Sequence, residues 1–387
     1  MKSARRLWIV AAAAVLSAAC IAVVVLIVAG RIPLGAESIE VASSATAAAD
    51  TSRYAGINTS EVRAELEAAG LADVPENILA TLSTLEKIDD YPIYTMRYFG
   101  PYIRASELQP EIDPDEAALK ATDWACSLIA ALGDPSRPMF GRSFDWEYSP
   151  ILVLTLEPEE GHRSIMSIDV AYLVDPADID RLDECEAEDL LGLLSAPFLT
   201  FDGMNEHGVA IGMAAVEHAS GYSSDPEKRD IGDMQLMREI LEAAGTVDEA
   251  IAFLEGINPT SQGGPSMHYL IADRTPSAAL IEYHDGEMAV FRSSAEAPWR
   301  HGTNFRVVLT EGHPAGNCWR YDLIDATLRE EEGALTVSEM LDLLADVSVA
   351  HTRWSIVYDL TALEMQLVIE RAWDDVHTFS LDGGSGE

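Results

Sequence analysis

The chain has 387 residues, of which 48% are hydrophobic, so it can form one large hydrophobic core or two ordinary ones. Its 65 acidic and 25 basic residues give a formal net charge of −40. A surface this acidic repels nucleic acid and anionic lipid headgroups, so neither is an expected partner.

The first 31 residues predict a membrane anchor. Three basic residues among the first six positions precede an uncharged apolar run from Leu7 to Gly30. That run is long enough to span a bilayer and too long for the core of a signal peptide. The early positive charges predict a cytoplasmic N-terminus, which places the rest of the chain outside the cytoplasm at the cell membrane. Cleavage at a lipoprotein-like Cys20 is the alternative, although the apolar run continues past that cysteine.

The next stretch divides into a stalk and a structured segment. Residues 32–58 are small, polar and aperiodic, and they are interpreted as a flexible stalk. Residues 59–125 are interpreted as a helical pro-segment or N-terminal subunit, with helix starts at Thr59 and Asp113. The main folded domain then covers residues 126–387.

From Trp124 onward the pattern becomes strand-like, because paired hydrophobic runs are joined by turn residues. Two amphipathic helices interrupt these runs. One covers about 234–254 with a break at Gly245 and Thr246, and the other starts at Thr336 with Glu339 completing a capping box. Many antiparallel hairpins with a few helices predict an α+β domain of stacked sheets covered by helices.

The cysteine count leaves an unpaired thiol outside the cytoplasm. If Cys20 lies in the membrane, Cys126, Cys185 and Cys318 remain in an oxidising compartment, and three thiols cannot all pair. Cys185 and Cys318 either form a disulfide, or Cys318 is a thiol near the functional site. The cysteine and histidine spacings fit no metal site, so neither a metal nor a cofactor is expected.

The segment from Cys126 to residue 146 places a thiol near a guanidinium and a carboxylate. The turn at 133–138 folds the second strand back, so Arg142 and Asp145 return to within about one strand spacing, roughly 5 Å, of Cys126. The guanidinium favours the nucleophilic thiolate. The alternative interpretation is a buried structural cysteine beside a surface ion pair.

Strand geometry limits which of these two side chains can face the thiol. Arg142 and Asp145 differ by three positions, so regular pleating places them on opposite faces of the strand. Both side chains can face the thiol only if the strand kinks or ends near Gly141.

The sequence also resembles a known family. The runs C-S-L-I-A and M-F-G-R-S-F-D-W are similar to the start of the mature catalytic chain in the choloylglycine hydrolase superfamily of N-terminal-nucleophile enzymes. That superfamily includes bile salt hydrolases, penicillin V acylases, acid ceramidase, N-acylethanolamine acid amidase and the related isopenicillin-N acyltransferases. Arg142 and Asp145 stand at the family's offsets from its nucleophilic cysteine, with Ser143 in place of the usual Asn. The family's later motifs resemble three further segments: Met204–Val209, Thr303–Phe305 and Cys318–Arg320.

The resemblance implies a four-layer αββα N-terminal-nucleophile fold, from about Pro75 to Leu381. The transmembrane helix predicted from the apolar run precedes this fold. It also implies an enzyme that hydrolyses linear, non-peptide amide bonds through an acyl-thioester. The expected substrate is a small molecule: an N-acyl amine, an N-acyl amino acid, or a penicillin- or bile-acid-like amide. An acyltransferase that passes the acyl group to an amine is one alternative. A catalytically silent extracytoplasmic binding domain is an alternative of another class. The oligomeric state stays open.

The resemblance assigns a role to each matching residue. Cys126 becomes the nucleophile, after its own thiol has cut the Ala125–Cys126 bond and freed the α-amine that serves as base. Asp145 orients that amine and Arg142 stabilises the thiolate. Asn304 donates to the oxyanion, and Arg320 holds Asp145 or the oxyanion side.

One departure from the family pattern affects the oxyanion hole. Bile salt hydrolases carry an Asn where this chain has Ala215, whose side chain cannot donate. Either a backbone N–H serves in its place, or another residue such as Glu217 does. The loss favours the silent binding domain, whereas the joint presence of Cys126, Arg142 and Asp145 favours the enzyme.

Four aromatic residues are candidates for an acyl pocket, with core packing as the alternative: Trp146, Tyr148, Tyr172 and Phe198.

Overall fold

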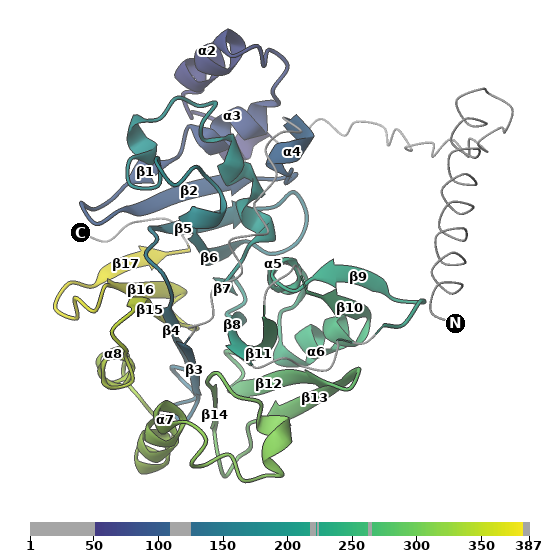
Figure 1. Ribbon diagram of the computed structural model, residues 1–387, viewed down its shortest axis with the longest axis vertical. Helices are drawn as coiled ribbons and strands as arrows, with labels where there is room; N and C mark the ends of the chain where they lie inside the picture. Colours follow the sequence, from purple (N-terminus) through teal and green to yellow (C-terminus); the bar gives the residue numbers. More distant parts are fainter. Residues whose placement is uncertain (1–50, 109–124, 217–221, 223, 262–264, 382–387) are drawn as a thin grey trace, which may run out of the picture. The chain divides into compact units, whose positions relative to one another are not determined.

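The computed structural model describes residues 51–108, 125–216, 222, 224–261 and 265–381 (Figure 1). Within these ranges, no helix is long and apolar enough to cross a membrane. The predicted anchor, residues 32–50 of the predicted stalk and the helix start predicted at Asp113 lie outside the described residues.

The larger sheet has nine strands in the order β1-β2-β5-β6-β7-β8-β11-β12-β13. All neighbours are antiparallel except β2 and β5, which run parallel. The strands are β1 (Glu86–Lys87), β2 (Ile93–Phe99), β5 (Ile151–Glu157), β6 (Ser164–Asp169), β7 (Asp202–Asn205), β8 (Ala210–Val216), β11 (Ser266–Asp273), β12 (Ser277–His284) and β13 (Glu287–Arg292).

The smaller sheet has six strands, all antiparallel, in the order β14-β3-β4-β15-β16-β17. They are β3 (Ala125–Ala131), β4 (Met139–Asp145), β14 (Trp299–Gly302), β15 (Thr352–Asp359), β16 (Glu364–Ile369) and β17 (His377–Ser380). A separate two-stranded parallel ribbon joins β9 (Arg229–Gly232) to β10 (Ile257–Thr260).

The two large sheets pack face to face. Leu128 and Phe140 of the smaller sheet belong to the same buried cluster as Met213 and Leu270 of the larger one. A Cβ atom at Gly212 of β8 would lie only 3.2 Å from a methyl of Leu128 and 3.1 Å from the ring of Phe140. Glycine at this position therefore lets the sheets approach closely without displacing these side chains.

Helices cover the outer face of each sheet (Figure 1). On the larger sheet, α5 (Gln235–Ala243) and α6 (Val247–Glu255) pack over β7, β8 and β11. On the smaller sheet, α7 (Trp319–Glu330) and α8 (Val337–Asp346) pack over β3, β14, β4 and β15. These layers form the α+β arrangement with αββα order that the sequence predicts.

Both predicted helix signals are present. Thr246 begins α6, and its side chain accepts a hydrogen bond from the backbone N–H of Glu249, which explains the break between α5 and α6. Thr336 and Glu339 form a complete capping box at the start of α8.

The flexible stalk predicted for residues 32–58 does not include Thr51–Tyr54. Thr51–Tyr54 form a 3₁₀ turn, and Nη1 of Arg53 donates to the carbonyl oxygens of Glu157 and Pro158, each at 2.7 Å. The ring of Tyr54 packs on Phe99 with centroids 5.5 Å apart. These contacts hold the segment against the larger sheet.

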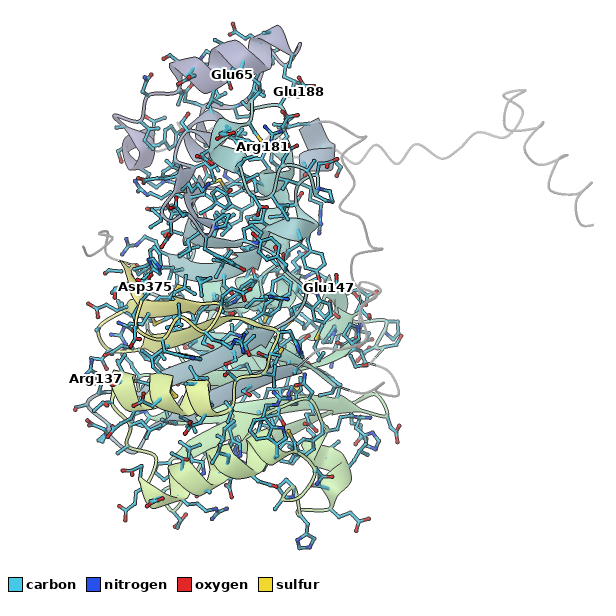
Figure 2. The ribbon with its side chains drawn as sticks, turned by 60° about the vertical axis from the view of Figure 1, so that its left-hand side comes forward. Glu65, Arg137, Glu147, Arg181, Glu188 and Asp375 are labelled. Atoms are coloured by element: carbon cyan, nitrogen blue, oxygen red, sulfur yellow. The ribbon has the colours of Figure 1, made fainter. Side chains whose placement is uncertain are left out.

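The segment 59–125 is also more than the helical unit that the sequence predicts. It contains α2 (Ser60–Ala68), α3 (Glu76–Leu82) and α4 (Ala105–Leu108), and it also supplies β1 and β2 of the larger sheet. Glu65 of α2 accepts a hydrogen bond from the backbone of Ala187, and Figure 2 shows Glu65 at the same end of the molecule as Glu188. Because β2 pairs along its whole length with β5, this segment is an integral part of the core.

Candidate active site

Cys126 is the second residue of β3, directly opposite Phe144 of β4. Its side chain faces the core between the two sheets, and the residue is 6% exposed. Cys126, Cys185 and Cys318 are all free thiols. The Cys185–Cys318 disulfide, left open by the sequence, is therefore not formed.

Arg142 provides the positive charge nearest to this thiol. Its Nη2 lies 3.8 Å from Sγ of Cys126, and its Nη1 donates to Oδ2 of Asp202 at 2.5 Å. Asp202, on β7 of the other sheet, also accepts hydrogen bonds from Ser167 and Tyr358. Arg142 and Asp202 are both fully buried. The guanidinium is thus fixed by a buried, hydrogen-bonded ion pair that joins the two sheets.

The carboxylate of Asp145 lies on the opposite face of β4 from the thiol. The pairing of β4 with β3 and with β15 runs without interruption through Gly141, so the kink considered from the sequence is absent. Only the backbone N–H of Asp145 is directed at the sulfur. Its Oδ1 accepts from Thr352 at 2.5 Å, and its Oδ2 lies 3.7 Å from Nη1 of Arg320.

Asn304 and Arg320 approach the backbone of Cys126 from the other side. The N–H of Cys126 donates to Oδ1 of Asn304 at 2.6 Å, and Nη2 of Arg320 donates to the same oxygen at 2.8 Å. Nη1 of Arg320 donates to the carbonyl of Cys126 at 2.5 Å. Arg320 lies in the first turn of α7, so the position of this helix determines where the guanidinium lies relative to β3.

Asn304 also contacts the backbone at Ala215, where bile salt hydrolases carry the second oxyanion asparagine. Nδ2 of Asn304 donates to the backbone carbonyl of Ala215 at 2.8 Å, so a carbonyl of Ala215, an acceptor, is the group that meets Asn304. One Nδ2 hydrogen of Asn304 remains for another acceptor. Glu217, the suggested substitute, lies outside the described residues.

Burial dominates the ionisation of the thiol in this uncut chain. It raises the pKa of Cys126, while the neighbouring guanidinium of Arg142 lowers it, and the net change is upward. The pKa of the Asp145 carboxyl is raised by burial too, although Thr352 and Arg320 act in the other direction. Cys318 differs, because hydrogen bonds from Thr303 and from the first-turn N–H groups of α7 outweigh its burial and lower its pKa.

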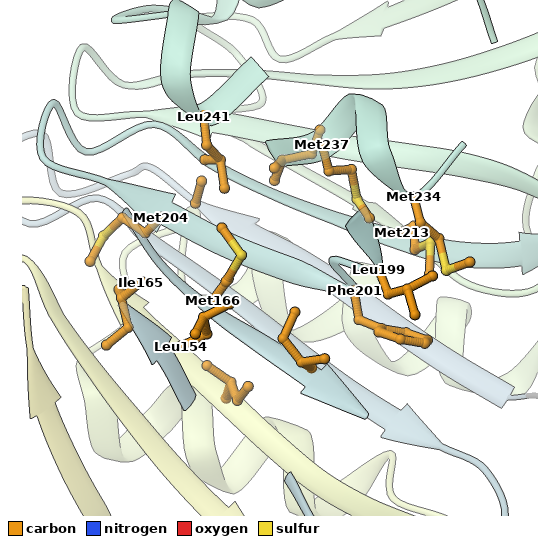
Figure 3. Close-up of a cluster of buried hydrophobic side chains, with 14 of the residues drawn as sticks. Leu154, Ile165, Met166, Leu199, Phe201, Met204, Met213, Met234, Met237 and Leu241 are labelled. Atoms are coloured by element: carbon orange, nitrogen blue, oxygen red, sulfur yellow. The ribbon is translucent and has the colours of Figure 1, made fainter. Parts of the chain in front are cut away.

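A small apolar cavity of about 40 Å³ opens at the thiol. Its walls are mainly aromatic rings and thioethers, from Phe144, Trp146, Tyr172, Phe201, Met213, Met234 and Met267, with Cys126, Arg142, Ala215 and Pro265 completing the lining. Figure 3 shows Met213, Met234 and Phe201 gathered at one end of the buried cluster. The arrangement can hold an apolar group against Sγ while it excludes water.

The aromatic candidates from the sequence divide in two. Trp146 and Tyr172 line this cavity. Tyr148 is 42% exposed and donates to Asp180, and Phe198 lies beneath the guanidinium groups of Arg104 and Arg238. The last two aromatics are therefore not part of the pocket.

Comparison with known protein families agrees with this geometry. The model of the linear amide C–N hydrolases of the choloylglycine hydrolase family matches residues 126–309, a segment that begins at the candidate nucleophile. Over this segment the chain is similar to the choloylglycine hydrolase family. The chain is an enzyme of the class that acts on carbon–nitrogen bonds other than peptide bonds. No curated protein sequence is significantly similar to the chain.

Three solved structures are similar to this chain over most of their own length. Penicillin V acylase from Agrobacterium tumefaciens is 15% identical, with 67% of this chain and 92% of that chain covered and a TM-score of 0.44. A mutant of conjugated bile acid hydrolase from Clostridium perfringens is 14% identical, with 67% and 95% covered and a TM-score of 0.47. A Caenorhabditis elegans ortholog of N-acylethanolamine-hydrolyzing acid amidase is 14% identical, with 61% and 93% covered and a TM-score of 0.40.

The candidate site includes residues that the sequence did not single out. Asp202, Ser167 and Tyr358 hold Arg142, and Thr352 holds Asp145. A buried arginine requires a carboxylate partner, so Arg142 could have predicted that an acidic residue such as Asp202 lies beside it. With 65 acidic residues in the chain, the sequence could not identify which one pairs.

One side-chain group within the described ranges has the geometry to hold a metal ion. The ligand atoms of Asp89, Asp375 and His377 lie within 4.8 Å of one another. His377 and Asp89 already form an ion pair at 3.3 Å, and Asp375 is exposed, so these surface contacts account for the cluster without a metal. None of the three lines the cavity at Cys126.

Proposed function

We propose that Cys126 is the nucleophile of an amide hydrolase that forms an acyl-thioester with the acyl group of a linear, non-peptide amide. The observation that carries the proposal is the buried guanidinium of Arg142, 3.8 Å from Sγ at the wall of an apolar cavity. A fixed positive charge beside a thiol favours the thiolate, which is the attacking form.

The proposal includes cleavage of the Ala125–Cys126 bond. The pKa of the thiol is raised by burial in the uncut chain, so the sulfur needs a base. Among the described residues, no histidine hydrogen-bonds to it. Cleavage would free an α-amine, with an ordinary pKa of about 8, next to the thiol. This amine would take the place of the N–H that now donates to Asn304, with the carboxylate of Asp145 available to orient it.

The chemical steps then balance without a cofactor. The thiol adds to the amide carbon and gives its proton to the α-amine. The oxyanion that forms accepts a hydrogen bond from the free Nδ2–H of Asn304. Arg320 holds the Asn304 side chain in place by donating to its Oδ1. The amine product leaves with the proton, and water hydrolyses the thioester to release a carboxylic acid and restore the thiol.

The pocket favours a substrate with an apolar acyl group. Its walls consist mainly of aromatic rings and thioethers, and Arg142 is the only charged side chain among the described lining residues. About 40 Å³ is a few times the roughly 10–15 Å³ that one water molecule needs, so the end of an acyl chain fits better than a large ring system. N-acyl amines and N-acyl amino acids are the first candidates, ahead of penicillin- or bile-acid-like amides.

Mass spectrometry and N-terminal sequencing of the purified protein test the cleavage step. A chain that starts at Cys126 should appear in the wild type and be absent in Cys126→Ser. A wild-type chain that stays whole while it hydrolyses amides would overturn the amine-as-base mechanism.

A panel of N-acyl amides tests the reaction itself. The processed wild type should release the free acid, and Cys126→Ser should not. Addition of a competing amine distinguishes a hydrolase from an acyltransferase, because only the acyltransferase would yield a new N-acylated product. No turnover of any member by processed protein, together with no acyl-enzyme adduct by mass, would favour the silent binding domain.

Anchoring by residues 1–31, with the active site outside the cytoplasm at the cell membrane, is part of the proposal. Its support is the uncharged run from Leu7 to Gly30 behind basic residues. Protease added to intact cells should digest the catalytic domain, and deletion of residues 1–31 should release the protein from the membrane fraction. Full protection in intact cells would contradict this orientation.

A further inference from the structure

A second cavity, of about 440 Å³, lies on the helix-covered side of the smaller sheet. It is formed by β14, the loop around 312–315 and α7. Its volume falls within the range of about 300–1,000 Å³ that is usual for small-molecule sites. It shares no lining residue with the cavity at Cys126.

His301 forms part of the wall of this second cavity and lacks hydrogen-bond partners. The residue is 3% exposed, and its ring packs at a tilt against that of Tyr321, with centroids 4.1 Å apart. Apart from a weak approach to the backbone of Tyr321, neither ring nitrogen has a hydrogen-bond partner in the described part of the chain. Burial lowers the pKa of His301 to about 4, so the neutral ring offers one donor and one acceptor at neutral pH. Leaving such groups unpaired costs free energy, so a bound molecule that pairs with them is favoured.

The charge at the cavity is positive although the protein as a whole is strongly acidic. The guanidinium of Arg300 donates to the carbonyl of Arg292 and has a buried Nε without a partner. Within the described ranges, no carboxylate lies within 4 Å of it. Arg329 adds a second guanidinium, and the one acid in the lining, Asp325, is already paired with it at 2.7 Å. The carboxylate of Asp325 acts on both guanidinium groups, so the lining carries two arginines against one acid in a chain whose net charge is −40.

We propose that this cavity binds a small organic anion through its carboxylate or phosphate group. The anionic oxygens accept hydrogen bonds from Arg300 and Arg329, and the neutral ring of His301 donates one more. Tyr321 and Trp299 in the wall supply aromatic surface for the rest of the ligand.

The position of this site connects it to the catalytic residues. His301 precedes Asn304 by three residues, and Tyr321 directly follows Arg320. Arg320 and Asn304 are hydrogen-bonded to each other and both contact the backbone of Cys126. A ligand that moves the rings of His301 and Tyr321 would therefore also move Asn304 and Arg320, which contact the backbone of Cys126.

Isothermal titration calorimetry with inorganic phosphate and with benzoate tests the proposal. One molecule of at least one of these anions should bind per chain, and the affinity should fall at least tenfold in Arg300→Gln and in Arg329→Gln. Arg329→Gln changes an exposed side chain and keeps the measurement possible if Arg300→Gln does not fold. The control is Arg181→Gln, which removes an exposed arginine paired with Asp178 and labelled away from this site in Figure 2.

The two probes distinguish the source of the anion. Preference for phosphate points to a phosphate ester, and preference for benzoate points to a carboxylate on an apolar body. Binding of neither anion, or equal binding by wild type, Arg300→Gln and Arg329→Gln, would overturn the proposal and leave water as the partner of His301. The same titration in Cys126→Ser needs no amide hydrolysis, so its result is separate from the fate of the proposed function.

Discussion

Nη2 of Arg142 lies 3.8 Å from Sγ of Cys126, and the two side chains share the inner face of adjacent strands. The guanidinium is held in place by Asp202 of the opposite sheet. The electrostatic environment of the thiol is therefore set by the packing of one sheet on the other, and not by the β3–β4 hairpin alone.

Removal of the Arg142 charge should make the thiol harder to ionise. In Arg142→Gln, we expect the pH midpoint of Cys126 alkylation to move upward, because burial remains while the opposing positive charge is lost. The measurement is the rate of iodoacetamide labelling of the Cys126 peptide across the alkaline pH range, by mass spectrometry. Cys185 and Cys318 in the same sample serve as internal references, and equal midpoints in both proteins would count against the thiolate role.

Asp202→Asn should destabilise the fold, because it leaves Arg142 as a buried charge without its partner. We expect a loss of about 3–5 kcal/mol in the free energy of unfolding, measured by urea denaturation. Asp189→Asn, at an exposed position, is the matched control and should change stability by less than about 0.5 kcal/mol. A similar small effect at both positions would mean that the ion pair is not structural.

Asn304→Ala should slow turnover without unfolding the protein. The substitution removes the Nδ2 donor, and loss of one oxyanion donor typically lowers kcat by about 10²–10³. The control is Asn317→Ala, at an exposed asparagine of the loop before α7. Because Arg320 also loses its acceptor at Oδ1, circular dichroism should accompany the kinetics. Wild-type kcat in a folded Asn304→Ala would exclude this oxyanion role.

Met234→Ala should change the acyl preference of the pocket. Met234 is 2% exposed and lines the cavity beside Met213, so its truncation extends the cavity at the thiol. We expect kcat/KM to shift by roughly 10-fold or more toward longer acyl chains, since one methylene in an apolar pocket changes discrimination by about 10–200-fold. Met340→Ala, buried against β4 on the far side of the smaller sheet, is the control for loss of stability alone. An unchanged ranking of acyl chains in Met234→Ala would show that the cavity does not hold the acyl group.

Asp169 should make stability depend on pH. Burial raises the pKa of its carboxyl to about 7, against about 3.9 in an unfolded chain. Between about pH 4 and 7, the Asp169 carboxyl is protonated in the folded protein and ionised in the unfolded chain. The stabilisation from the protonated carboxyl is therefore complete below about pH 4 and is lost as the pH rises through about 7. Asp169→Asn, which mimics the neutral acid, should match wild type at about pH 4 and exceed it by up to about 4 kcal/mol at about pH 8.

Urea unfolding at about pH 4, 6 and 8 measures this effect. The backbone N–H of Ala171, which donates to Oδ1 of Asp169 at 2.9 Å, keeps an acceptor in the Asn variant. A stability difference that is the same at all three values would show that the Asp169 carboxyl does not titrate in this range.

Local patterns in the sequence predicted local structure well. The capping residues Thr246 and Thr336 begin α6 and α8, since a cap depends only on residues within one turn. The hairpin from Cys126 to Asp145 forms with the expected pairing, because the short turn fixes its register. The predicted opposite faces of Arg142 and Asp145 are likewise observed, as the pleat alone requires.

Contacts between distant segments were outside the reach of these patterns. The segment 59–125 was predicted to be helical, yet β2 is a strand because β5, far along the chain, offers a parallel partner. Thr51–Tyr54 looked like a stalk because the small, polar residues around them give no sign of the carbonyl groups that receive Arg53. The cavity at His301 has no sequence signature at all, since its walls come from β14, a loop and α7.

The class of the protein and the candidate nucleophile follow from the sequence alone, because the residue types and spacing from Cys126 to Asp145 are local and specific. The interactions of those residues with one another depend on the tertiary structure. It joins Arg142 to Asp202 and turns the Asp145 carboxylate away from the thiol. The physical reason is that burial and long-range pairing determine the strength and direction of each charge, and both depend on how the sheets and helices pack.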